Sequence, residues 1–286
     1  MHILITIRGA KQSESALRLG AQIARTAHSS VTILNVIKLN KNRAKAEAIL
    51  ARALDLLGSE VLTKQGKIRT GDPATEIVRE AEEGNYDLII VGSRSSRNLV
   101  ERVKGSTGEQ VLAHAPTPVL IVKGGNVLSK EPIRHTLVCS SGIDGHEGPS
   151  WHVPRLATIF ADNEMTILHV MSQISSSPEA REGWQLQADA EKLIDEHTPE
   201  GRRLEERVIL LRDEGFHVKA KIRHGLVVDE ILEEAQSGDY DLVVIGAHQM
   251  MGWKHYLLDN VAHQIILQID RPILIMPTSQ NQEPSS

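Results

Sequence analysis

Two glycines and a basic loop make residues 91–107, VGSRSSRNLVERVKGST, the stretch best suited to chemistry. Gly92 ends an apolar run, and without a Cβ its backbone can turn sharply and approach a ligand closely. Gly105, Ser106 and Thr107 precede a predicted helix, whose free N–H groups and positive dipole end attract anions. The loop has a local charge of +3, from Arg94, Arg97, Arg102 and Lys104 against Glu101. This pattern indicates a site for phosphate.

The same residues also fit an ordinary helix start. Ser106 and Glu109 stand at the two ends of STGE, a capping-box pattern in which both side chains bond backbone N–H groups at the start of the helix. A capping box needs no ligand, and the arginines would then form a solvated face. The residues alone leave both interpretations open.

The chain contains this passage twice, at a constant offset of 154 residues. Residues 71–93, GDPATEIVREAEEGNYDLIIVGS, align without a gap with residues 225–247, GLVVDEILEEAQSGDYDLVVIGA, and PVLIV aligns with PILIM near the end of each copy. Such a repeat predicts two homologous halves. We expect a first domain at 1–123, a linker at 124–132, a second domain at 133–277 and a disordered tail at 278–286.

The second copy of the loop is less suited to phosphate. Asp259 and Asn260 stand where the first copy has Gly105 and Ser106. A carboxylate at that place repels an anion unless a metal intervenes. The second loop is also apolar, with Met250, Met251, Trp253 and Tyr256. We expect it to pack against the rest of the protein.

Strands and helices alternate in each half. In the first half, apolar runs predict strands at 2–7, 30–37, 66–71, 87–93 and 117–123, and helical spacing predicts helices at 13–27, 44–62, 72–84 and 106–115. Ser13 and Asp72 are the expected N-caps. The second half repeats this order, with a helix near 151–161 and a long helix within 179–214. The alternation predicts an α/β fold with parallel sheets, right-handed crossovers and helices on both faces.

Composition and missing motifs argue against several classes of function. The formal net charge of -5 is unlike that of a general nucleic-acid binder. The first apolar run is too short for a membrane span, so we expect a cytoplasmic protein. Thirteen histidines lack metal-ligand spacing, and neither a P-loop nor a G-x-S-x-G elbow occurs, so no metal site and no catalytic residue is predicted. The single cysteine, Cys139, is expected in a strand core.

The two halves resemble the universal stress protein (UspA) superfamily in its tandem form. The resemblance rests on GDPATEIV, YDLIIVGSR and GSTGEQVLAHAPTPVLIV, and it extends over almost the whole chain. It implies two Rossmann-like domains of the adenine nucleotide alpha hydrolase-like type, each with a five-stranded parallel sheet. It also implies that the halves pair through their last strands, PVLIV and PILIM, as a pseudo-dimer within one chain.

The resemblance further implies an ATP site in the first half. The ATP-binding subgroup has spaced glycines followed by glycine and Ser or Thr. The pattern has four defined positions. In the first half Gly92, Gly105 and Ser106 match it, whereas Ser95 replaces one glycine. In the second half one of the four positions matches. Relatives that bind nucleotide have an aspartate after the first strand, where this chain has Arg8. Arginine cannot accept hydrogen bonds, so the hold on adenosine must differ.

The implied nucleotide contacts are Ile7, Arg8, Val36, Gly92, Ser93, Arg94, Ser95, Gly105, Ser106 and Thr107. Val36 would lie against the base and Arg94 near the phosphates. We expect an ATP-binding regulatory module of the stress response that acts with an unidentified protein partner. Two alternatives stay open, an interaction protein that binds no nucleotide and a slow ATPase. Whether Mg²⁺ accompanies ATP, and whether intact chains form a further homodimer, are open as well.

Overall fold

The fold was analysed in a computed structural model that describes residues 1–9, 13–38, 42–93, 107–123, 133–140, 164–171, 187–249, 256–257 and 260–278. Two compact units make up the chain. The first contains Met1–Pro132, Gln249–Leu258 and Asp270–Pro277, and the second contains Ile133–His248, Asp259–Ile269 and Thr278–Ser286. The last strand of the sequence therefore belongs to the first unit.

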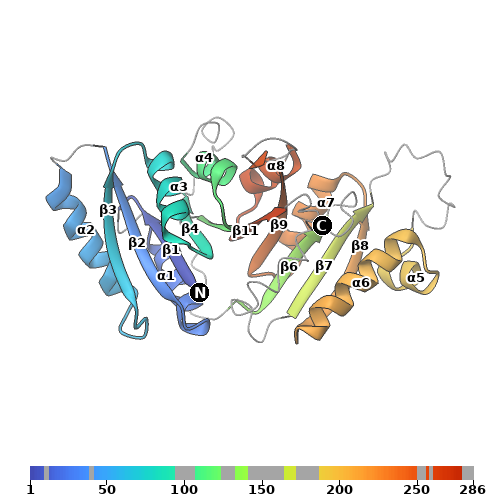
Figure 1. Ribbon diagram of the computed structural model, residues 1–286. Helices are drawn as coiled ribbons and strands as arrows, with labels where there is room; N and C mark the ends of the chain where they lie inside the picture. Colours follow the sequence, from blue (N-terminus) through green and yellow to red (C-terminus); the bar gives the residue numbers. More distant parts are fainter. Residues whose placement is uncertain are drawn as a thin grey trace, which may run out of the picture. The chain divides into compact units, whose positions relative to one another are not determined.

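The first unit is built on parallel strands that alternate with helices (Figure 1). Its elements are β1 (His2–Ile7), α1 (Glu14–Thr26), β2 (Ser30–Ile37), α2 (Arg43–Leu56), β3 (Lys64–Thr70), α3 (Pro73–Gly84), β4 (Leu88–Ser93), α4 (Thr107–His114) and β5 (Val119–Lys123). Strand order is β3-β2-β1-β4-β5, and every neighbouring pair is parallel. The chain moves outward in one direction after β1 and in the other after β3. Right-handed crossovers then place α1 with α2 and α3 with α4, one pair on each face of the sheet.

The last strands of the two halves pair with each other, as the family resemblance implies. β11 (Ile273–Thr278) lies antiparallel to β5, with Leu274 opposite Leu120 and Ile275 opposite Val119. All four of these side chains are buried. The two-residue strand β10 (Tyr256–Leu257) lies against α4 in the same unit.

The second unit repeats the alternation of strands and helices. Its elements are β6 (His135–Ser140), β7 (Glu164–Met171), α5 (Ala190–Asp195), α6 (Pro199–Asp213), β8 (His217–His224), α7 (Val227–Ser237), β9 (Leu242–Gln249) and α8 (Asn260–Gln268). Strand order is β9-β6-β7-β8, again with parallel neighbours. The α/β class and the parallel sheets predicted from the sequence are confirmed.

One predicted helix is shorter than expected, and its end lies at a local break. The helix expected to run to residue 62 ends at Leu56, because Gly58 adopts a positive φ of 78°. The long helix expected within 179–214 is α6, and the shorter α5 precedes it in the same range. Between them His197 has a φ of 51°, and the Thr198 hydroxyl accepts a hydrogen bond from the Gly201 N–H at 3.0 Å. The predicted helix near 151–161 lies outside the described residues.

The predicted start and end of α3 are confirmed. Asp72 Oδ1 accepts hydrogen bonds from the N–H groups of Ala74 and Thr75, each at 3.1 Å, and Pro73 occupies the first turn. The helix ends at Gly84, after which Asn85 takes a left-handed conformation. The helix begins here for two reasons. The proline has no N–H group that would need a partner in the first turn, and the carboxylate accepts from two N–H groups that have no partner within the helix.

Candidate functional site

The candidate site lies where β1, β2 and β4 end. β1 is the neighbour of both other strands, and the chain leaves β1 and β4 in opposite directions. A parallel sheet opens a crevice at such a reversal, beyond the carboxyl ends of the strands. Ile7 is buried at the end of β1, whereas Val36 on β2 and Gly92 on β4 are partly exposed. Ser93 is the last residue of β4.

The turn after β1 is held by Ser13 in a way that the sequence did not predict. Ser13 stands at the N-cap of α1, but its side chain makes no capping bond. Its hydroxyl instead accepts a hydrogen bond from the Arg8 N–H at 3.3 Å, and its own N–H donates to the Gly9 carbonyl at 3.1 Å. The backbone of Arg8 is therefore held in place at the edge of the crevice.

The side chain of Arg8 reaches across the end of the sheet to α4. Its Nη2 donates to Thr107 Oγ1 at 3.3 Å, a contact between residues 99 apart in the sequence. Two of the predicted site segments, the end of β1 and the start of α4, are thus in contact. Arg8 is exposed, and no carboxylate within the described ranges forms an ion pair with it. Its charge and the positive end of the α4 dipole point to an anionic ligand.

Several predicted site residues have no described position. Arg94, Ser95, Gly105 and Ser106 lie outside the described residues, so their roles stay predictions. The structure places the other six predicted residues at the carboxyl edge of the sheet: Ile7, Arg8, Val36, Gly92, Ser93 and Thr107.

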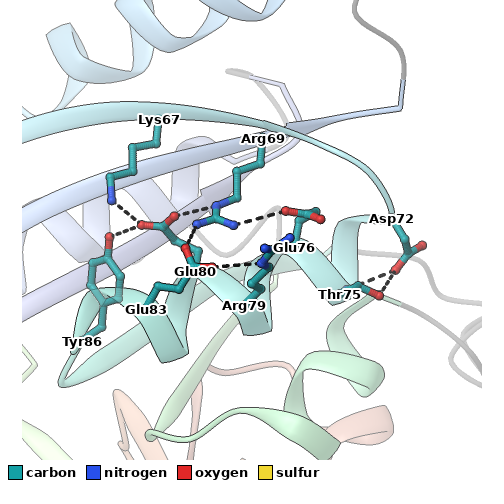
Figure 2. A network of polar contacts seen from close by, with 9 residues as sticks. All are labelled: Lys67, Arg69, Asp72, Thr75, Glu76, Arg79, Glu80, Glu83 and Tyr86. Atoms are coloured by element: carbon teal, nitrogen blue, oxygen red, sulfur yellow. Dashed lines mark hydrogen bonds and ion pairs between the residues drawn. The ribbon is translucent and has the colours of Figure 1, made fainter.

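A buried polar network between α3 and β3 is the main feature that the sequence reasoning missed (Figure 2). At its centre Glu80 is only 1% exposed. Its Oε1 accepts hydrogen bonds from Lys67 Nζ at 2.6 Å and from the Tyr86 hydroxyl at 2.7 Å, and its Oε2 accepts one from Arg69 Nε at 2.7 Å. Burial alone would raise the pKa of Glu80, but these three donors together lower it.

The second unit contains the same network. Glu234, also 1% exposed, accepts from Lys221 Nζ at 2.8 Å, from the Tyr240 hydroxyl at 2.7 Å and from Arg223 Nη1 at 3.0 Å. The offset of 154 residues carries each member of the first network onto its counterpart in the second. The signal was therefore present in the sequence, as identical polar residues within a repeat whose apolar positions vary.

Cys139 and the possible metal ligands are the other chemical groups that the sequence singles out. Cys139 is buried in β6, and burial raises the pKa of its thiol, which confirms the prediction of a strand-core residue. The described parts of the chain contain no cluster of three or more His, Cys, Asp or Glu residues suited to a metal. No helix among the described residues combines the length and apolarity needed to cross a bilayer.

Comparisons with known proteins agree with the duplicated fold. The sequence profile of the universal stress protein family matches residues 1–123 and 143–277. A universal stress protein of Mycolicibacterium smegmatis is 23% identical over 303 aligned residues that cover 96% of each chain. Universal stress protein YxiE of Bacillus subtilis is 28% identical over 144 residues, which cover 42% of this chain and 97% of that protein.

A solved structure extends the agreement to three dimensions. The crystal structure of a universal stress protein from Archaeoglobus fulgidus matches with a TM-score of 0.73 at 18% identity, covering 97% of this chain and 98% of that one. At this level of identity the match concerns the fold.

Proposed function

Because the chain belongs to the universal stress protein family, we propose that its first half binds an adenine nucleotide, with ATP as the expected ligand, at the carboxyl ends of β1 and β4. In this proposal the protein is a nucleotide-dependent regulatory module of the cytoplasmic stress response. The observation that carries it is the contact between Arg8 and Thr107. That contact brings a positive charge, which has no carboxylate partner among the described residues, to the start of a helix at the carboxyl end of the sheet, and this combination suits a phosphate group.

Each part of the nucleotide has a counterpart in this arrangement. The phosphates would lie at the start of α4, near Arg8 and the Thr107 hydroxyl. Gly92, which has no Cβ, would let the ligand approach the end of β4. The base would lie against the partly exposed Val36 on β2. Arg8 would supply donors to phosphate where relatives have an acceptor for adenosine, so phosphate would contribute more to affinity than the base does.

The second half has a structural or regulatory role in this proposal. Its helix α8 begins at Asn260, directly after Asp259. A carboxylate at that position would repel the phosphate that the start of a helix otherwise attracts. We therefore expect one nucleotide per chain.

Calorimetric titration with ATP tests the proposal. Wild type should bind one equivalent, and Gly105→Asp, which copies the second half, should remove binding while the circular dichroism spectrum is unchanged. Asp259→Gly combined with Asn260→Ser is the matched variant in the other half, and it should leave the first site intact. Absence of ATP binding by wild type would refute the proposal.

Arg8 also favours a second candidate function, an interaction protein that binds no nucleotide. A guanidinium has five donors and no acceptor, so it cannot replace a carboxylate that holds adenosine. Protein purified without added ligand and then denatured should release nucleotide, seen as absorbance at 260 nm, only if the first candidate is right. If wild type also releases phosphate from ATP and Gly105→Asp does not, the module is a slow ATPase.

A further inference from the structure

Arg69 on β3 is held by three carboxylates from one face of α3 (Figure 2). Its Nε donates to Glu80 Oε2 at 2.7 Å, its Nη1 donates to Glu76 Oε2 at 3.3 Å, and its Nη2 donates to Glu83. The three acids are spaced four and three residues apart, so they lie on one side of the helix. The side chain of Arg69 is 20% exposed and that of Glu76 is 16% exposed, so the guanidinium is fixed in a partly buried position.

Arg69 is the cross-strand partner of Val36. The parallel register of β2 and β3 pairs these two residues directly. Side chains alternate between the faces of a sheet, and paired residues in neighbouring parallel strands share a face. The fixed arginine therefore lies beside the valine at the end of β2.

The turn after β3 connects the same network to the end of β2. The Gly71 N–H donates to the Ile37 carbonyl at 3.0 Å, one residue beyond Val36. A Cβ on Gly71 would lie 2.9 Å from Glu76 Cγ, so this glycine allows the carboxylate to pack directly against the turn. Glu76 thus touches the turn on one side and holds Arg69 on the other.

The second unit has an equivalent support, in which the arginine nitrogens pair with the carboxylates in a different order. Arg223 pairs with Val170 in the register of β7 and β8, and its guanidinium donates to Glu230 at 2.6 Å. The Gly225 N–H donates to the Met171 carbonyl at 3.3 Å, and a Cβ on Gly225 would lie 2.4 Å from Glu230 Oε1. The second unit therefore offers a matched control, in which equivalent contacts support a half that we expect to be empty.

We propose that Glu76 and Arg69 are positioning residues that hold Val36 in place for the base of the bound nucleotide. The inference rests on the proposed function. Glu76 acts through the Gly71 turn and through Arg69, and neither residue needs to touch the ligand. Loss of this support should weaken the interaction with the base and leave the interaction with the phosphates at α4 unchanged.

The test compares Glu76→Ala with Glu230→Ala in the full-length protein, using ATP and inorganic tripolyphosphate as probes. Glu76→Ala should weaken ATP binding about five- to tenfold, roughly the loss of one apolar contact, with no change in the inhibition constant of tripolyphosphate measured by competition. Glu230→Ala should leave both constants at the wild-type values. Each variant removes one carboxylate bond to the arginine and the contact with the turn glycine, and Glu230→Ala removes the shorter bond, so both thermal unfolding temperatures should fall, that of Glu230→Ala at least as far.

Rescue by the conservative variant separates positioning from a general structural effect. Glu76→Gln keeps an oxygen that can accept from Arg69, so it should restore most of the ATP affinity. Equal effects of Glu76→Ala and Glu230→Ala on ATP binding would overturn the inference, and so would equal losses for ATP and tripolyphosphate. If wild type binds no ATP, the proposed function itself fails and this inference fails with it.

Discussion

Replacing Glu80 by alanine should destabilise the first unit more than any other single change in the network. The carboxylate is 1% exposed and accepts hydrogen bonds from two cations and one hydroxyl. Its removal leaves Arg69, Lys67 and Tyr86 to find new partners in a partly buried place. Breaking a buried ion pair on one side costs about 3–5 kcal/mol. Lys67 is 41% exposed and can turn to water, so the lower end of that range is expected.

Tyr86→Phe provides the comparison within the same network. It removes one hydroxyl and leaves both cations on Glu80, so about 1 kcal/mol should be lost. Glu234→Ala is the matched variant in the second unit. Together the three variants distinguish the stability that comes from the buried charge from the stability that comes from one hydrogen bond. They also show the contribution of the network in each unit separately.

Native-state hydrogen exchange at increasing urea reports each unit separately. In Glu80→Ala, the free energy of opening should fall in peptides from β3 and α3, whereas Glu234→Ala should lower it in β8 and α7. A loss below about 1 kcal/mol for Glu80→Ala, or a loss no larger than that of Tyr86→Phe, would refute the view that the buried carboxylate organises the edge of the sheet.

Three further outcomes follow from the described contacts. The pKa of Glu80 is lowered in the folded state. The ionised carboxylate therefore contributes to the free energy of unfolding above the ordinary pKa of 4.5, and this contribution disappears as the pH falls through the folded pKa. In chemical denaturation, acid should destabilise wild type more steeply than Glu80→Gln. Cys139, whose buried thiol has a raised pKa, should react with a disulfide reagent only after unfolding, and rapid reaction in the native state would contradict its burial. Thr198→Ala removes the cap on Gly201 and should cost about 1 kcal/mol in urea unfolding, with Thr198→Ser close to wild type.

The elements of the fold could be predicted because their signals are local. Continuous aliphatic runs mark the strands, and Asp72 with Pro73 marks the start of α3. The break between α5 and α6 has the same kind of signal. Thr198 followed by Pro199 is a cap and a first-turn proline, the pair that starts α6.

The location of the site at one edge of the sheet could be predicted from the sequence. The contacts between its side chains could not. Strand order alone brings the residues after β1 and before α4 to one end. The Ser13 hydroxyl, for example, accepts from the Arg8 backbone N–H and does not cap the helix behind it. A serine before a helix fits both uses equally well, so a sequence cannot distinguish them.

The duplicated network shows how a repeat within one chain can separate structure from function. Both units keep a buried glutamate with the same lysine, arginine and tyrosine, whereas only the first keeps glycine and serine before its fourth helix. A network that is present in both units must first serve what both units share, which is the attachment of an edge strand to a helix. Any role in ligand binding then appears as a difference between equivalent substitutions in the two units. A loss of ligand affinity measured in the first unit alone cannot show such a role, because the substitution also destabilises the unit. The loss of stability is common to both units, so it cancels only when the equivalent substitutions are compared.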